Sequence, residues 1–136
     1  MNTTVLLVAG EPFVREGIRS ILHDYEDVHV VGEASHGGEA IQYARMLRPH
    51  VILMDLSMPH MDEVQATRVI KEEDPDTVII GLSIAEAGTM PKALLRAGAT
   101  TYLAKDRIIE DLYPTIARCL DCSALPGQPS KQPWSI

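Results

Sequence analysis

Three polar residues with complementary chemistry each stand at or just beyond the end of a short apolar run: Asp55, Ser83 and Lys105. A carboxylate such as that of Asp55 can attack a phosphoryl donor and form an acyl phosphate. The new phosphoryl oxygens would then be stabilised by a nearby cation, here Lys105, and by a hydroxyl donor, here Ser83. A divalent ion such as Mg²⁺, which takes oxygen ligands in octahedral geometry, would offset the remaining negative charge. Brought together by a fold, these side chains would form a site for accepting a phosphoryl group.

Five short apolar runs are the expected strands that must position these residues. Consecutive runs begin roughly 23 residues apart, which leaves room for a helix and two loops each time. Several runs are continuously apolar, which is typical of strands buried on both faces of a parallel sheet. The runs are Val5–Val8, Val28–Gly32, Val51–Met54, Val78–Leu82 and Thr101–Leu103.

The segments between the runs place apolar residues at helical spacing. Pro12 suits the first turn of the first helix, and Gly98 suits the C-terminal cap of the fourth. Pro114 lies inside the fifth apolar stripe, where we expect it to kink or delay that helix. The stripes are Val14, Ile18, Ile21 and Leu22; Ala40, Ile41, Ala44 and Leu47; Val64, Thr67, Val69 and Ile70; Ala93, Leu94 and Ala97; and Ile109, Leu112, Ile116, Cys119 and Leu120.

The order of elements, β-α repeated five times, predicts an α/β fold. Right-handed crossovers then give a flavodoxin-like three-layer sandwich, in which a five-stranded parallel sheet of order 2-1-3-4-5 has helices on both faces. Sites in such sheets lie beyond the carboxyl ends of the strands, so Asp55, Ser83 and Lys105 are expected at one edge.

Composition sets limits on the class of protein. The chain has 136 residues, 46% of them hydrophobic and 23% charged, as in an ordinary globular domain. A net charge of −7 disfavours direct nucleic-acid binding. No apolar run approaches the roughly 20 residues of a membrane span, and no basic segment precedes the first apolar run. With only two cysteines, a reducing, cytoplasmic location is expected.

The composition changes near the C-terminus, where proline, serine and glutamine become frequent. We therefore expect one folded domain over residues 1–122. Residues 123–136 are expected to form a flexible tail or the start of an interdomain linker.

The segment Asp55–Pro59 (DLSMP), with Asp62 after it, resembles the phosphoacceptor loop of response-regulator receiver domains. Ser83, Tyr102 and Lys105 stand where that family has its switch hydroxyl, switch aromatic residue and invariant lysine. The similarity covers about residues 4–122 in the correct order. It implies that Asp55 is the phosphoacceptor and that Ser83, Tyr102 and Lys105 bind or sense the phosphoryl group.

Two further segments, Phe13–Ile18 (FVREGI) and Arg96–Ala99 (RAGA), resemble the receiver subgroup that is usually fused to a helix-turn-helix output domain. The family's Mg²⁺ ligands would include the carboxylate of Asp55 and the backbone carbonyl of Ser57. Any effect on transcription would then pass through another domain or protein.

The sequence departs from the family pattern where the metal should bind. Ala9 and Gly10 stand in place of two acidic residues after the first strand, and Glu11 follows one position later. Glu63 replaces the glycine usual after the Asp62 equivalent. Mg²⁺ releases its waters reluctantly, so one carboxylate and a carbonyl should hold it weakly or not at all.

These observations predict an atypical receiver domain of two-component phosphorelay signalling, a protein-interaction switch rather than an enzyme. Mg²⁺-dependent phosphorylation at Asp55 is expected to be weakened or absent, with the Lys105–Asp55 pair as a permanently charged stand-in. The expected partner is a histidine kinase or another signalling protein. Homodimers could form through the family's output face, here about residues 86–120, or through the first and fifth helices.

Two alternatives remain open at this point. In the first, Glu11 rescues the metal site, and the chain is a conventional receiver phosphorylated at Asp55 by a histidine kinase. In the second, the chain is a flavodoxin-like ligand-binding or redox protein that uses Cys119 and Cys122. Cys119 shares the apolar stripe of its helix, so a buried structural role is favoured for it.

Overall fold

The computed structural model describes residues 2–56, 63–83 and 90–124, and within them strands and helices alternate as the sequence predicts. A short 3₁₀ helix, η1 (Lys105–Arg107), precedes the last helix. The strands are β1 (Thr3–Val8), β2 (Val28–Ala34), β3 (Val51–Asp55), β4 (Val78–Ser83) and β5 (Thr101–Ala104), and the helices are α1 (Pro12–His23), α2 (Gly37–Leu47), α3 (Glu63–Glu73), α4 (Met90–Ala97) and α5 (Ile108–Ala124).

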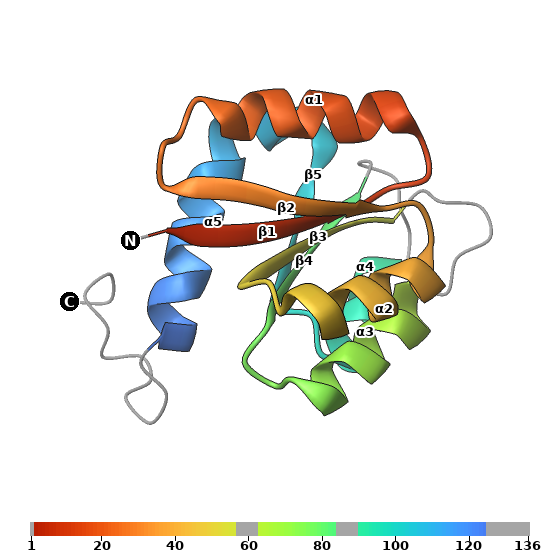
Figure 1. Cartoon of the computed structure of the whole chain (residues 1–136). Coiled ribbons are helices and arrows are strands. Elements are labelled where there is room, and N and C mark those ends of the chain that lie inside the picture. The colour runs from red at the N-terminus through yellow and green to blue at the C-terminus, as the bar shows by residue number, and fades with distance from the viewer. Residues whose placement is uncertain (1, 57–62, 84–89, 125–136) are drawn as a thin grey trace.

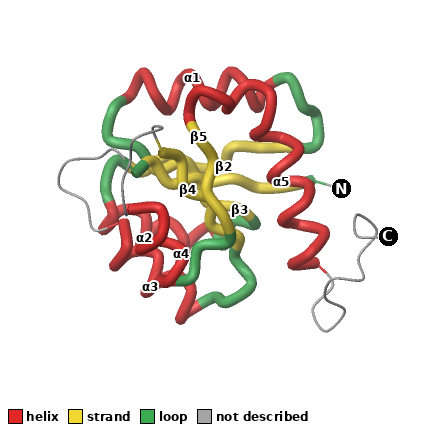
Figure 2. Tube along the Cα trace, turned by 180° about the vertical axis from the view of Figure 1, so that it is seen from behind, coloured by secondary structure: helices red, strands yellow, loops and turns green. Residues whose placement is uncertain are grey.

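The strands form one parallel sheet in the order β2-β1-β3-β4-β5, which confirms the predicted flavodoxin-like topology. Helices α1 and α5 cover one face of the sheet, and α2, α3 and α4 cover the other (Figure 1; Figure 2). The result is the expected three-layer sandwich.

The two faces of the sheet contribute to two separate apolar clusters. Because successive side chains of a strand point to opposite faces, Val51 and Leu53 pack toward α1 and α5. Ile52 and Met54 pack toward the three helices on the other side. Every residue of β3 and β4 is buried, which explains why these two runs are apolar without alternation.

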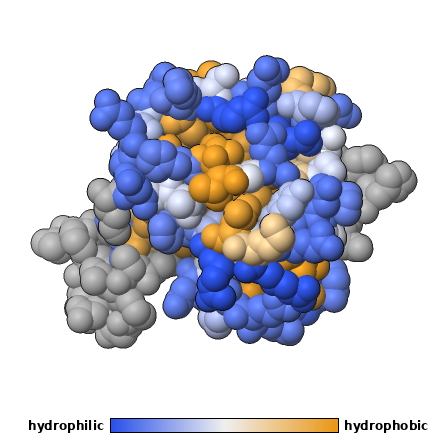
Figure 3. All heavy atoms as spheres, viewed as in Figure 1, coloured by the Kyte–Doolittle hydropathy of each residue, from blue (hydrophilic) through white to orange (hydrophobic). Residues whose placement is uncertain are grey.

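Strand β2 forms one edge of the sheet and contains an irregularity. Its register with β1 shifts between Val5 and Leu6, so that Val31 has no counterpart on β1. Such a bulge increases the local twist, which is one way to protect an edge strand from pairing with another chain. Apolar side chains gather on this side of the molecule (Figure 3), and Val31, Met46 and Leu47 are among the large apolar residues that are exposed.

The proline and glycine predictions have different outcomes. Pro12 opens α1, and Gly98, with a φ of 122°, follows the last residue of α4, both as predicted. The expected delay at Pro114 is wrong, because α5 begins at Ile108 and runs through the proline. Pro114 is exposed, so the carbonyl that it leaves without an intrahelical donor is near solvent.

A stacked tyrosine pair joins α5 to the loop before β2. The rings of Tyr25 and Tyr113 are parallel, with centroids 4.0 Å apart. The Tyr113 hydroxyl donates a hydrogen bond of 2.7 Å to Oδ2 of Asp27. This bond needs the phenolic proton, and together with burial it raises the pKa of Tyr113.

The raised pKa of Tyr113 predicts a specific pH dependence of stability. A group whose pKa is higher in the folded state contributes stability below its unfolded pKa, about 10 for tyrosine, and loses that contribution as pH rises through the folded pKa. The urea midpoint of the wild type should therefore fall above pH 10, and Tyr113→Phe should remove part of this fall. Tyr43→Phe, on the other face of the sheet, should leave the alkaline profile unchanged. Identical profiles for wild type and Tyr113→Phe would contradict the assignment.

Candidate functional site

Asp55 and Lys105 form an ion pair at the carboxyl edge of the sheet. Asp55 ends β3 and its side chain is only 3% exposed, whereas Lys105 follows β5 and begins η1. Lys105 Nζ lies 2.6 Å from Asp55 Oδ1. The structure thus brings together the predicted carboxylate and ammonium from two strands with β4 between them.

Ser83 lies on that intervening strand and is buried. It ends β4 and is paired with Ala104 of the neighbouring strand β5. The residue before it, Leu82, is paired with Asp55, and its carbonyl accepts a hydrogen bond of 2.8 Å from the backbone N–H of Leu56. Ser83 is therefore at the same edge as Asp55 and Lys105, as the strand assignments predict.

The remaining predicted switch and metal residues have different surroundings. Tyr102, in β5, is 44% exposed, which leaves its ring open to solvent or to a partner. Ser57 and Asp62 lie outside the described residues. The predicted carbonyl ligand at Ser57 thus stays a prediction.

The segment that should carry the acidic pair is held by backbone contacts and by Arg15. Ala9 is buried, and its N–H donates to the carbonyl of Ala34 over 3.0 Å. Its own carbonyl accepts a hydrogen bond of 2.6 Å from Arg15 Nη1. Gly10 and Glu11 are exposed, and Glu11 precedes α1 without a side-chain capping bond.

Arg15 is fixed in this position by Glu33 of β2. Arg15 Nε donates to Glu33 Oε1 over 2.9 Å, and Arg19 pairs with the other carboxylate oxygen. The field of Arg15 also contributes to the lowered pKa of Glu39, whose larger causes are hydrogen bonds from the N–H and hydroxyl of Ser35. The guanidinium of Arg15 therefore lies at the carboxyl end of β1.

Sequence analysis did not predict the Arg15–Glu33 pair. The available signal was the spacing of Arg15 and Arg19, which puts two cations on one face of α1. Their carboxylate partner lies on another element, and the sequence spacing alone does not show which acidic residue reaches them.

The described residues offer few ligands for a divalent cation. No group of three or more acidic, histidine or cysteine side chains within residues 2–56, 63–83 and 90–124 is arranged to hold a metal ion. Asp55 already pairs with Lys105, and the Ala9 carbonyl accepts from Arg15. Mg²⁺ prefers several oxygen ligands in octahedral geometry, which these two groups alone do not supply.

Glu63 is a further carboxylate near this edge, at the first residue of α3. It is only 1% exposed, although glutamate is rarely buried in proteins. The family resemblance shows that a glutamate stands at this position in place of the usual glycine. It does not show that the glutamate side chain is buried.

Cys119 is buried in the cluster between α5 and the sheet, so the predicted burial of this residue is confirmed. The side chain of Cys122 lies outside the described part of the chain.

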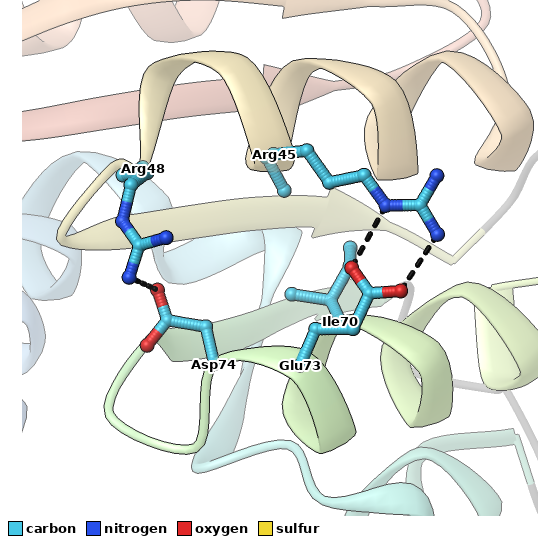
Figure 4. A pocket seen from close by; sticks show the side chains of 6 residues that line it. Arg45, Arg48, Ile70, Glu73 and Asp74 are labelled. Carbon is cyan, nitrogen blue, oxygen red and sulfur yellow. Dashed lines mark hydrogen bonds and ion pairs between the residues drawn. The ribbon is translucent and has the colours of Figure 1, made fainter.

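A small pocket between α2 and α3 lies away from this edge, at the C-terminal ends of the two helices (Figure 4). Arg45 forms two hydrogen bonds with Glu73, of 2.8 and 2.6 Å, and Arg48 lies 3.8 Å from Asp74. The hydrogen bonds between these two side chains raise the pKa of Arg45 and lower the pKa of Glu73. These exposed pairs join two helix ends, and their charges already compensate one another.

Comparison with known proteins gives a consistent result. Residues 5–117 match the model of the response regulator receiver domain. Over 112 residues, 82% of the chain, it is 37% identical to the response regulator GacA of Pseudomonas protegens and 39% identical to the response regulator UvrY of Escherichia coli K12. These matches cover 53% and 51% of the two relatives, so the chain spans about half their length.

A solved structure supports the fold independently. The response regulator domain of Thermotoga maritima CheB superposes with a TM-score of 0.80 at 27% identity, covering 88% of this chain and 97% of that domain. Within the described ranges, no helix combines the length and the apolar character needed to cross a membrane.

Proposed function

Since the chain belongs to the response regulator receiver domain family of two-component signalling, we propose that it is a protein-interaction switch in which Mg²⁺-dependent phosphorylation of Asp55 is weakened or absent. The observation that carries this proposal is the structure at Ala9. Where the resemblance implies a carboxylate, there is a methyl group, and the adjoining carbonyl is bound by the guanidinium of Arg15.

Charge balance supports the proposal. Phosphoryl transfer to a carboxylate depends on cations that neutralise the developing negative charge. With an acidic pair, Mg²⁺ would be attracted to the carboxyl end of β1. With Ala9 and Gly10 at these positions, and with Arg15 on the Ala9 carbonyl, neither position offers a carboxylate to a divalent cation.

The Lys105–Asp55 pair is the basis for the second part of the proposal. Lys105 Nζ lies 2.6 Å from Asp55 Oδ1, an oxygen of the carboxylate that the resemblance identifies as the phosphoacceptor. We infer that this contact is a permanent arrangement that the sequence sets, and that a partner or another ligand shifts the equilibrium between conformations.

The interaction surface is proposed on α4, β5 and α5. Three large apolar residues of these elements are exposed, namely Leu95, Tyr102 and Ile109, at 38%, 44% and 71%. Exposed aromatic and aliphatic side chains are the residues on which a partner can bury apolar surface. A histidine kinase or another signalling protein is the proposed partner, and a second copy of the chain is the alternative occupant.

Calorimetric titration with Mg²⁺ tests the weakness of the metal site. We expect no saturable binding in the millimolar range for the wild type, and the same baseline for Asp55→Asn. Saturable submillimolar binding that Asp55→Asn abolishes would contradict the proposal. If Glu11→Gln also abolished such binding, the conventional receiver with Glu11 as a metal ligand would be the better account.

A further inference from the structure

A cavity lies between the C-terminal half of α1 and the beginning of β2, the edge strand of the sheet (Figure 1). Its volume is about 250 Å³. The covered part of its wall is apolar, because Leu22 and Val28 are buried and Val30 is half-buried. A small apolar group that enters the cavity can therefore leave water there. The lining residues are Arg19, Leu22, His23, Val28, His29 and Val30.

The exposed part of the wall is basic. It consists of Arg19, His23 and His29, and the Arg19 side chain is 46% exposed. Arg15, Arg19 and His23 follow one another at intervals of four residues, so they lie along one side of α1. Both arginines pair with Glu33. One carboxylate thus faces two guanidinium groups, which leaves a positive charge to attract an anion.

The distribution of charge along the chain points to the same kind of ligand. The whole chain carries a net charge of −7, yet residues 12–23 and 28–48 contain four arginines against three glutamates. The acidic excess lies entirely in the rest of the chain. Among the described residues, no carboxylate lines the cavity. Asp24 and Glu26 follow α1 outside its wall, and the Asp27 carboxylate accepts a hydrogen bond from a tyrosine of α5.

We propose that this cavity binds a carboxylate carried by a short apolar group. The guanidinium of Arg19 and the imidazole N–H groups of His23 and His29 donate to the carboxylate, and a guanidinium matches two carboxylate oxygens at once. The apolar group lies against Leu22 and Val28. Small organic acids and the C-terminal carboxylate of a peptide chain share this chemistry, and the experiment below distinguishes these two sources.

The site has a consequence for the Asp55 edge. A bound carboxylate competes with Glu33 for Arg19. Glu33 also holds Arg15, whose guanidinium donates to the carbonyl of Ala9 at the carboxyl end of β1. Occupation of the cavity is thereby transmitted to the segment next to that edge. This consequence rests on the proposed function, in which a ligand shifts the equilibrium between conformations, whereas the binding itself does not.

An NMR titration of the whole ¹⁵N-labelled chain tests the proposal. The probes are 4-methylpentanoate as a free acid, N-acetyl-leucine as a chain end, and N-acetyl-leucinamide as its uncharged match. We expect saturable shifts at residues 19–23 and 28–30 with both acids, and dissociation constants on the order of 1 mM for such small ligands. The amide should bind at least about fivefold more weakly, because it lacks the charge. The acid that binds more tightly identifies the source.

A double variant tests the basic wall. Arg19→Gln combined with His29→Gln should weaken binding of the acids at least about fivefold, while Arg15 still holds Glu33. Arg68→Gln, which removes an exposed arginine from α3 on the other face of the sheet, should leave binding unchanged.

Equal binding of N-acetyl-leucine and its amide, or unchanged binding by the double variant, would overturn the proposal. Inorganic phosphate that binds as tightly as the acids would also overturn it, because the apolar wall would then contribute nothing. Shifts of the Ala9 and Gly10 amides along the same saturation curve support the link to the Asp55 edge, and their absence would overturn that link alone. The titration contains neither Mg²⁺ nor a phosphodonor, so its result is independent of the proposed function.

Discussion

Replacing Ala9 and Gly10 together by aspartate is expected to increase Mg²⁺-dependent phosphorylation of Asp55 by at least about 100-fold, because the two carboxylates supply the ligands that a catalytic divalent cation needs. Both positions follow β1 at the edge where Asp55 lies.

The matched control is Ala9→Asn with Gly10→Asn, which adds the same bulk without charge. The rate is measured by intact mass after incubation with a small-molecule phosphodonor, with and without a chelator. We expect the aspartate variant alone to gain a chelator-sensitive phosphoryl group at an increased rate. Equal rates for the wild type and the aspartate variant would show that the missing pair does not limit the reaction.

Arg15 should oppose this restored site. Its guanidinium binds the Ala9 carbonyl and would remain close to the new carboxylates. We therefore expect the rate of Mg²⁺-dependent phosphorylation to increase further when Arg15→Gln is added to the aspartate variant. One cation that competes with Mg²⁺ is then absent.

The second large effect is expected from Lys105→Met. The substitution removes the Lys105 cation from a carboxylate that is 3% exposed, and removing one partner of a buried ion pair is strongly destabilising. Lys105 is 25% exposed, so the loss in the free energy of unfolding should be smaller than for a fully buried pair, about 1–3 kcal/mol.

A double-mutant cycle with Asp55→Asn isolates this interaction. In the Asp55→Asn background, Lys105→Met should cost much less, because no buried charge remains to be compensated. Lys92→Met, an exposed lysine of α4, is the control and should be nearly neutral. Additive effects of Lys105→Met and Asp55→Asn would contradict a direct coupling between the two side chains.

The fold could be predicted because each strand and each helix is indicated by residues within its own segment. Each strand run is apolar and short, each helix has its own stripe, and the parallel order follows from the handedness of crossovers. Asp55, Ser83 and Lys105 then meet at one edge by topology alone. Only the delay expected at Pro114 is wrong, because α5 begins at Ile108 and continues through this exposed proline.

The electrostatics of the site could be predicted only in part. The absence of the acidic pair is visible at Ala9 and Gly10, but the guanidinium on the Ala9 carbonyl results from contacts between β1, α1 and β2. The burial of Glu63 depends likewise on how α3 packs. Such long-range contacts determine which charges are compensated, and residue spacing does not reveal them.

Intact-mass analysis of the wild-type chain, incubated with a small-molecule phosphodonor and Mg²⁺ beside Asp55→Asn, tests the central claim most directly. We predict that both proteins keep their original mass, or that the wild type gains only a trace of one phosphoryl group. A rapid, nearly complete gain by the wild type that is absent in Asp55→Asn and on chelation of Mg²⁺ would contradict the account.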